Sequence, residues 1–237
     1  MSDVSSGSPP PGPVEDLLEA TPGTAYFWGR VAGDGELTGD RVTVRTGDGT
    51  AADALAAIAG AGRTSHDHRV AARESAHDAS IVRYEDEYRL KVFGPPAERA
   101  GAALGLPIDG HPGGYRFEAF ADYRPQLVRG LLEACGTVCF RESSGSVGVS
   151  FVHGEALLRT VRSLLDAAEP RAPADDLSGT SSGGRWFGLA DDADTAAFAR
   201  WVYDGSAGSG LYSATRRQKL HRSVERATGS GVGELSR

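Results

Sequence analysis

Residues 25–35 read AYFWGRVAGDG, and residues 126–136 read QLVRGLLEACG. Both stretches are apolar, contain small residues and end in glycine, which favours a short helix in each case. Gly29 aligns with Gly130, and the final glycines of the two stretches align at the same offset. The two stretches therefore predict an internal duplication in which each copy opens with a glycine-bearing helix.

The segments after each opening helix repeat one order of elements. In the first copy, residues 41–45 alternate with a period of two, as a strand does, and an alanine-rich helix is expected over 51–61. Further strands are expected over 69–72 and 81–93, and a helix over 95–104. The second copy predicts a strand over 146–151, a helix over 155–168, a strand over 185–189 and a helix ending at Tyr203.

The match extends to single residues. The pattern Val42-x-Val44-x4-Gly49-x-Ala51 has the same spacing as Val147-x-Val149-x4-Gly154-x-Ala156. The residue numbers of matching positions in this pattern differ by four more than those in the opening helices. This difference predicts a longer hairpin in the second copy. We therefore expect an extension over 1–24, disordered apart from a short helix near Val14–Ala20, then repeats over 25–109 and 110–227. A disordered tail over 228–237 is expected to follow.

The opening stretches resemble the signature of the LAGLIDADG homing endonucleases and their relatives. The resemblance covers roughly residues 25–226 and implies an α+β fold of two pseudo-symmetric αββαββα repeats. In that fold a concave, saddle-shaped sheet straddles duplex DNA and the two motif helices pack together at the repeat interface. The small residues fit such packing because residues four apart share one helix face. The expected interface residues are Gly29, Gly33, Gly130 and Ala134.

The resemblance also implies an acidic residue at the end of each motif helix, where it would hold a divalent metal such as Mg²⁺. Asp34 matches that position in the first copy, and Cys135 matches it in the second. A thiol is a poor ligand for Mg²⁺, which binds hard oxygen donors. Glu133 is expected to point about 200° around the helix from position 135 and not to replace it. Cys135 therefore predicts a degenerate second catalytic position.

Basic residues are expected on one face of the first sheet. Arg41 and Arg45 alternate with valines, and Arg89 and Lys91 share a face of the later strand. A DNA-binding sheet needs such a face, since phosphate contacts require positive charge. The second copy has Ser146, Gly148 and Ser150 on the corresponding face. The other candidate nucleic-acid contacts are Arg69, Arg73, Arg216, Arg217 and Lys219.

The composition limits the remaining possibilities. The formal net charge is −7, lysine is rare, and alanine, glycine and aspartate are abundant, as in proteins of salt-loving archaea. A cluster of His66, Asp67, His68, His77 and Asp78 is expected in a hairpin loop, where its spacing matches no zinc site. No apolar run reaches the ~20 residues of a membrane helix, and no secretory signal opens the chain. We expect a free-standing cytoplasmic monomer whose two repeats form an internal pseudo-dimer.

These features predict a LAGLIDADG-like protein that binds duplex DNA and whose nuclease activity is weakened, restricted to nicking or lost. Mg²⁺ is expected as a cofactor only if cleavage survives. Two alternatives share the fold. One is an active Mg²⁺-dependent DNA endonuclease that tolerates Cys135. The other is a non-catalytic module, either a regulator or a maturase-like protein that binds RNA.

Overall fold

A computed structural model describes residues 14–60, 63–71, 83–94, 96–142, 145–169, 174–181, 183–189 and 192–228. The first repeat contains α1 (Pro22–Asp34), β1 (Glu36–Thr38), β2 (Arg41–Thr46), α2 (Gly49–Ala59), β3 (Arg63–Ala71), β4 (Arg83–Phe93) and α3 (Pro96–Leu104). Its strands form an antiparallel sheet in the order β1-β2-β4-β3. Helix α2 covers the apolar face of this sheet, where Val42, Val44 and Leu90 are buried.

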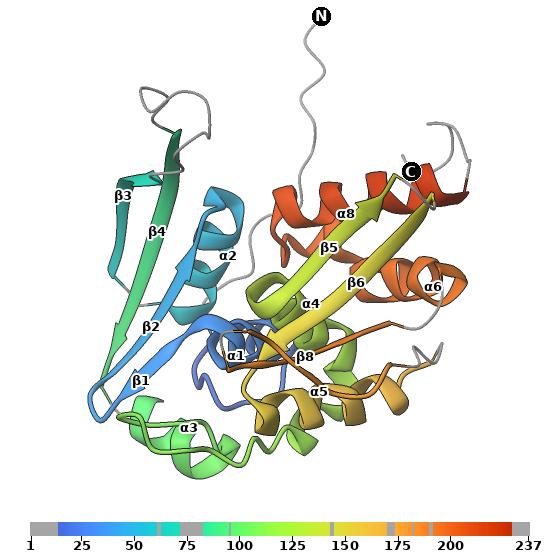
Figure 1. Ribbon diagram of the computed structural model, residues 1–237. Coiled ribbons are helices and arrows are strands. Elements are labelled where there is room, and N and C mark those ends of the chain that lie inside the picture. Colours follow the sequence, from blue (N-terminus) through green and yellow to red (C-terminus); the bar gives the residue numbers. More distant parts are fainter. Residues whose placement is uncertain are drawn as a thin grey trace, which may run out of the picture.

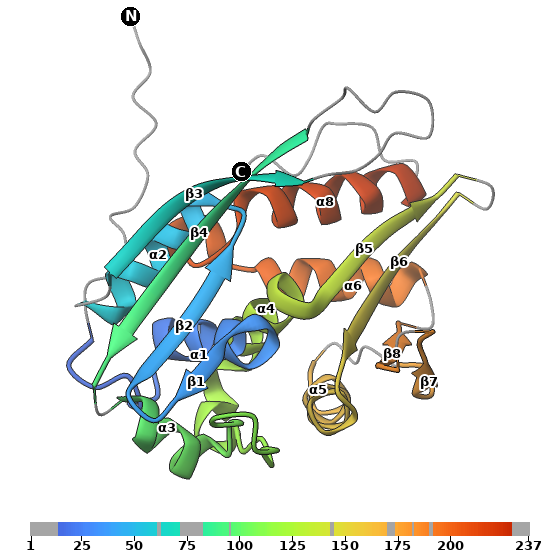
Figure 2. The same ribbon diagram turned by 60° about the vertical axis from the view of Figure 1, so that its left-hand side comes forward.

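The second repeat has the same order of elements. After the 3-10 helix η1 (Glu118–Tyr123), it contains α4 (Arg124–Cys135), β5 (Gly136–Arg141), β6 (Ser146–His153), α5 (Glu155–Asp166), β7 (Ser178–Gly179), β8 (Arg185–Gly188) and α6 (Asp192–Tyr203). Its sheet order, β5-β6-β8-β7, reproduces that of the first repeat. The short α7 (Ser206–Ser209) and the final α8 (Ala214–Thr228) follow. The expected α+β duplication is confirmed, with two separate sheets on either side of the α1–α4 pair (Figures 1 and 2).

Some expected elements differ from the structure. Strand β1 was expected to be a turn, and strand β5, which begins directly after α4, was not predicted. Residues 14–20 form turns and bends in place of the expected short helix. The first helix, α1, begins only at Pro22. The backbone of residues 66–68 pairs with β4 and does not form a loop, while His77 and Asp78 lie outside the described residues. The β5–β6 hairpin is longer than β1–β2, as expected.

The start of α1 is fixed by its sequence. Thr21 accepts a hydrogen bond from the Thr24 backbone N–H, and the Thr24 hydroxyl lies 3.0 Å from the Thr21 nitrogen, which completes a capping box. Pro22 occupies the first helical turn, where its missing N–H costs nothing. Helix α1 is therefore held in register at its beginning, and the motif glycines fall on the face toward α4.

Helices α1 and α4 pack backbone to backbone. A methyl group on Gly130 would lie 2.4 Å from the Tyr26 carbonyl oxygen, and one on Gly29 would lie 2.3 Å from the Leu127 carbonyl oxygen. Further along, a methyl group on Gly33 would lie 2.4 Å from the Ala134 Cβ. Only small residues permit this separation, so the motif helices form the interface between the repeats, as the fold predicts.

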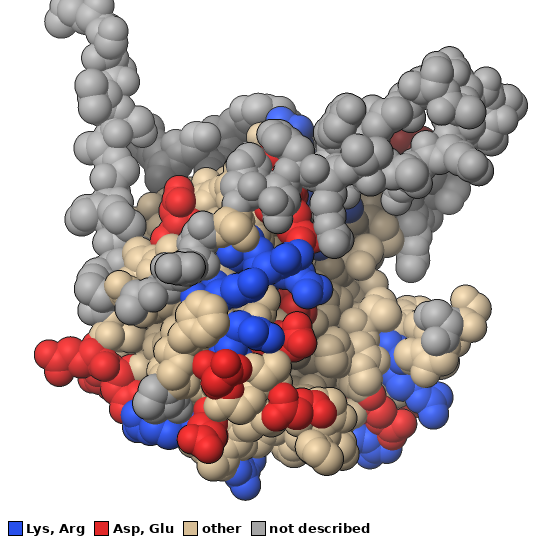
Figure 3. Space-filling model, turned by 90° about the vertical axis from the view of Figure 1, so that its left-hand side faces the viewer, with Lys and Arg blue, Asp and Glu red and all other residues tan. Residues whose placement is uncertain are grey.

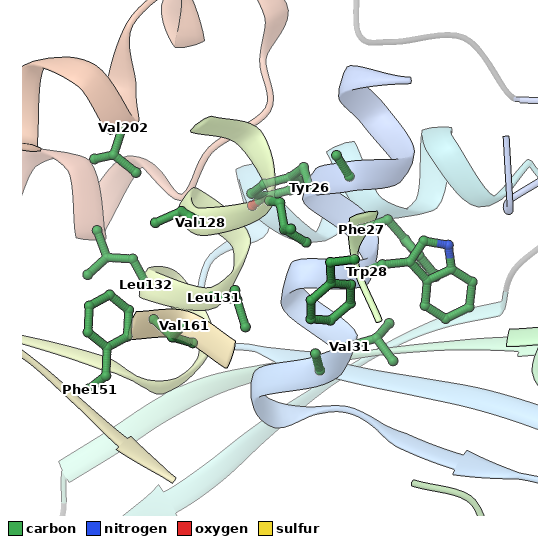
Figure 4. Packing of buried hydrophobic residues seen from close by; sticks show 14 of the residues in the cluster. Tyr26, Phe27, Trp28, Val31, Val128, Leu131, Leu132, Phe151, Val161 and Val202 are labelled. Carbon is green, nitrogen blue, oxygen red and sulfur yellow. The ribbon is translucent and has the colours of Figure 1, made fainter. Parts of the chain in front are cut away.

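Large apolar side chains surround this contact. Trp28 on α1 and Leu131 on α4 are fully buried, and Figure 4 shows them in one cluster with Phe151 of β6 and Val202 of α6. The cluster joins the two repeats in one core. Within the described residues, no helix has both the length and the apolar character needed to cross a bilayer.

A buried arginine attaches the C-terminal segment to this core. Arg129 of α4 donates to the carbonyl oxygens of Val202 at 2.6 Å, Leu211 at 2.8 Å and Asp204 at 3.1 Å. Its guanidinium also lies over the Tyr203 ring. These bonds satisfy a charge that would otherwise be buried at high cost. They fix the chain between α6 and α8.

Candidate functional site

The two motif helices end in the same way. Asp34 is the last residue of α1 and Cys135 is the last residue of α4. Each is followed by a glycine in extended conformation, Gly35 with φ −85° and Gly136 with φ −86°, whose N–H bonds back to the preceding turn. The structure therefore places Asp34 and Cys135 at equivalent positions, and only their chemistry differs.

The Asp34 carboxylate is already paired with a cation. Arg30 lies one turn earlier on α1, and its Nη2 is 3.0 Å from Asp34 Oδ2. The Asp34 side chain is 31% exposed, while that of Arg30 is 2% exposed. Burial raises the pKa of Asp34, and the charges of Arg30 and Arg216 offset only part of that effect. The Asp34 carboxylate is thus already close to positively charged arginines in the protein alone.

Cys135 is a half-buried thiol that lies near Asp34, Arg30 and Arg216. Its Sγ lies 3.3 Å from the Leu131 carbonyl oxygen, to which it donates. Burial raises its pKa to about 12, and the negative charge of Asp34 adds to this shift. A protonated thiol is a weak nucleophile, and its soft sulfur is a poor ligand for Mg²⁺, which prefers oxygen donors.

Glu133 is a buried carboxylate whose contacts the sequence did not predict. It lines the same pocket as Asp34, and its side chain is fully buried. Its Oε2 accepts from the Tyr26 hydroxyl at 2.7 Å, and its Oε1 accepts from the Ser213 N–H at 2.9 Å and the Tyr203 hydroxyl at 3.1 Å. Both oxygens are occupied, so Glu133 does not stand in for the missing acid at position 135.

The C-terminal segment closes one side of this pocket. Asp48 caps α2, and its Oδ2 accepts from the Ser213 hydroxyl and the Thr215 N–H, each at 2.9 Å. Although burial alone would raise the pKa of Asp48, these hydrogen bonds lower it below its usual value. Arg216 follows on α8 and donates to the Gly136 carbonyl oxygen at 3.3 Å. The first turn of α8 therefore carries a cation to the ends of both motif helices.

The residues at the motif ends do not fit the divalent metal that the family resemblance implies. Mg²⁺ requires oxygen ligands in near-octahedral geometry. Here one end has a thiol, and the other has a carboxylate paired with Arg30. The nearby Glu133 is fully buried and already accepts three hydrogen bonds. No group of three or more His, Cys, Asp or Glu suited to a metal occurs within the part of the chain that the structure describes.

The outer face of the first sheet carries basic side chains. Arg41, Arg45, Arg89 and Lys91 share this face because Thr43 pairs with Lys91 and Arg45 pairs with Arg89 across β2 and β4. Figure 3 views the molecule from this side and shows blue side chains gathered in the middle, with red ones around them. Two of the charges have acidic neighbours. Arg89 Nη2 lies 2.7 Å from Glu87 Oε1, and Arg45 Nη2 lies 3.9 Å from Glu36 Oε2.

The remaining predicted contacts are dispersed. Arg216 and Arg217 point apart, since the Arg217 guanidinium lies over the Tyr212 ring, and Lys219 is exposed further along α8. The backbone of Arg69 lies in β3, and Arg73 lies outside the described residues. Thr43 is buried and not an exposed polar residue of the basic face.

The corresponding face of the second sheet has a different character. Ser146, Gly148 and Ser150 lie on it, and Val152 and Trp186 face each other there across β6 and β8. Val152 is 44% exposed and Trp186 is 38% exposed. The two outer faces are therefore unequal. The first is basic with one exposed apolar residue, Phe93, which pairs with Arg41, and the second has small polar and apolar residues at these positions.

Comparisons with known proteins identify the family. The model of a LAGLIDADG family described as "Putative archaeal homing endonuclease" matches residues 1–230. The chain therefore belongs to the LAGLIDADG family. No curated protein sequence matches the chain.

Solved structures show similarity at low sequence identity. The N-terminal LAGLIDADG domain of DUF199/WhiA is 13% identical, with a TM-score of 0.49 over 79% of this chain and 86% of that one. Full-length DUF199/WhiA from Thermatoga maritima is 11% identical, with a TM-score of 0.49 over 93% of this chain and 66% of that one. I-DmoI in complex with DNA and Ca is 12% identical, with a TM-score of 0.47 over 80% of this chain and 93% of that one.

Proposed function

We propose that this chain binds duplex DNA and has lost double-strand cleavage. The observation that carries the proposal is the inequality of the two motif ends. Asp34 is paired with Arg30 at 3.0 Å, and its counterpart Cys135 is a thiol with a pKa of about 12. Cleavage of both strands requires a working centre for each strand. Here the second end has no carboxylate, and the carboxylate at the first end is already paired through its Oδ2 with the Arg30 guanidinium.

The support for DNA as the ligand is the basic face together with family membership. Arg41, Arg45, Arg89 and Lys91 lie on one surface of the first sheet. A surface of this kind binds phosphates without needing positive net charge over the whole chain. The first repeat therefore supplies most of the binding energy, and Arg216 adds a contact near the motif ends.

A supercoiled plasmid incubated with the protein and Mg²⁺ or Mn²⁺ tests the loss of cleavage. The proposal predicts retarded migration of the complex, and unchanged supercoiled plasmid after the protein is digested away. Linear product would show an active endonuclease and overturn the proposal. Nicked product that Asp34→Asn abolishes would instead show that one centre still works.

The variant Cys135→Ser is the matched control for the assay. It removes the thiol without adding a carboxylate, so it should behave as the parent protein does. The circular dichroism spectrum of a plasmid-free sample with the same metal ions checks that the protein remains folded.

A further inference from the structure

Two buried charged side chains, Arg30 and Glu133, meet the partly exposed Asp34 between the motif helices. Arg30 and Asp34 come from α1, and Glu133 comes from α4. The Arg30 Nη2 lies 3.0 Å from Asp34 Oδ2 and 2.9 Å from the Arg45 carbonyl oxygen. Its Nη1 lies 3.9 Å from Glu133 Oε2. One guanidinium therefore faces an acid from each repeat.

Within the described residues, the Arg30 guanidinium is held through Nη2, which makes both of its hydrogen bonds, while its buried Nε has no hydrogen-bond partner. The Arg30 side chain is 2% exposed and that of Glu133 is fully buried. A guanidinium stays protonated in proteins, so Arg30 is a permanent cation. Buried charges persist only when they are paired, and removing one partner of such a pair typically destabilises a protein strongly. Arg30 is therefore part of the architecture of the interface.

Other arginines also contribute positive charge near the two acids. Arg45 and Arg216 act on Asp34, and Arg129 acts on Glu133. Each acid of the centre therefore already has at least two arginines nearby. A divalent ion would have to bind Asp34 against these arginines, and against Arg30 above all because Arg30 touches the carboxylate.

We propose that Arg30 is the resident cation of this centre, where its guanidinium supplies Asp34 and Glu133 with the positive charge that a metal ion would otherwise supply. This inference rests on the proposed loss of cleavage and goes beyond it. Cys135 removes one ligand, whereas Arg30 keeps metal from the acid that remains. Restoring a carboxylate at position 135 is therefore insufficient to restore a metal site.

The test compares Mn²⁺ binding by three full-length proteins, followed by the electron paramagnetic resonance signal of free Mn²⁺. They are the parent protein, Cys135→Asp, and Cys135→Asp combined with Arg30→Met and Glu133→Gln. The Glu133 change avoids leaving an unpaired buried carboxylate. Adding Asp34→Asn to the triple variant shows whether binding uses this centre.

The proposal predicts no Asp34-dependent binding by the parent protein or Cys135→Asp. The triple variant should bind Mn²⁺ at least roughly tenfold more tightly than Cys135→Asp, because ligand charge sets affinity for hard cations. Equal binding by Cys135→Asp and the triple variant would overturn the role of Arg30 and leave the proposed loss of cleavage intact. A folded triple variant that binds no Mn²⁺ would overturn it as well.

Thermal unfolding provides a second readout. Mn²⁺ should raise the melting temperature of the triple variant and leave that of the parent unchanged, because a ligand stabilises only the state that binds it. If the methionine variant does not fold, Arg30→Gln in the same background removes the charge and keeps hydrogen-bonding capacity. The glutamine variant should show the same increase in melting temperature with Mn²⁺. A folded glutamine variant without that increase would contradict the proposal.

Discussion

Glu133 is the most deeply buried acid at the repeat interface, and its three hydrogen-bond donors come from three different elements. Tyr26 lies on α1, Tyr203 lies on α6, and Ser213 directly precedes α8. Burial nevertheless raises the pKa of Glu133, since these donors and Arg30 offset only part of the desolvation. The ionised carboxylate is therefore kept at a cost that depends on pH.

Replacing Glu133 with Gln should change how stability depends on pH. The pKa of Glu133 in the folded protein lies above the usual 4.5. The loss of stability caused by burying the ionised carboxylate is therefore complete above the folded-state pKa and disappears as the pH falls toward 4.5. The free energy of unfolding of the parent, relative to Glu133→Gln, should thus rise as the pH is lowered from about 8 to about 5. Urea denaturation of both proteins across this range measures the difference. A constant difference would contradict the raised pKa.

The two cysteines should differ sharply toward a thiol reagent. Cys139 is exposed, whereas Cys135 has a pKa of about 12. At pH 8 only about one Cys135 in 10⁴ is the reactive thiolate. Native protein treated with a chromogenic disulfide should therefore release colour quickly for one thiol, and Cys139→Ser should abolish the fast phase. A fast phase that survives in Cys139→Ser would show that Cys135 is reactive.

The sequence predicts part of this centre. The chemical inequality of Asp34 and Cys135 is visible once the two motifs are aligned. The Arg30–Asp34 pair also has the spacing of one helical turn, so it was available as a signal. The contact between Arg30 and Glu133 depends on the relative orientation of α1 and α4 about their axes, and no local sequence pattern encodes that orientation.

At the scale of elements, the contact between α1 and α4 depends on glycine. The space beside Gly130 is occupied by backbone atoms of the partner helix, with Tyr26 O and Arg30 N at 2.4 and 2.8 Å from an added methyl group. Backbone atoms cannot rotate away as a side chain can. Any side chain here must push the two helices apart.

Gly130→Ala should therefore destabilise the protein by about 1–3 kcal/mol, the usual cost of overpacking. Gly23→Ala is the matched control on α1, since its methyl group would make only ordinary contacts with side chains, Ile58 at 3.4 Å and Thr21 at 3.8 Å. That change should be neutral or stabilising because alanine favours helix more than glycine does. Chemical denaturation measures both, and equal effects would contradict the close packing.

The elements themselves were predicted unevenly. Helices and strands with clear periodicity, such as α4, α5 and β6, fall within a few residues of the expected ranges. Strand β1 was missed because three residues are too few to show alternation. Strand β5 was missed because it follows α4 without a turn, so no Gly/Pro-rich boundary separates the two elements beyond Gly136 itself.

At the scale of the whole molecule, the duplication retains its architecture and loses its chemical symmetry. Both repeats have the same sheet order, and both motif helices end in an extended glycine. The first repeat has the carboxylate and the basic face, whereas the second has Cys135 and the exposed Val152–Trp186 pair. The proposed DNA contacts should accordingly come mainly from the first repeat.

The central claim is tested most directly by the salt dependence of binding to a labelled duplex of mixed sequence, measured by fluorescence anisotropy. Arg45→Gln with Lys91→Gln removes two charges from the basic face. Arg159→Gln with Arg162→Gln removes two charges from α5, outside that face. The control pair matches the change in net charge.

If the basic face binds DNA, the Arg45/Lys91 variant should bind at least roughly tenfold more weakly at low salt, with a slope of log affinity against log salt that is smaller by about 2. The Arg159/Arg162 control should bind as the parent does. Equal losses in the two variants, or no binding of duplex by the parent protein, would contradict the account.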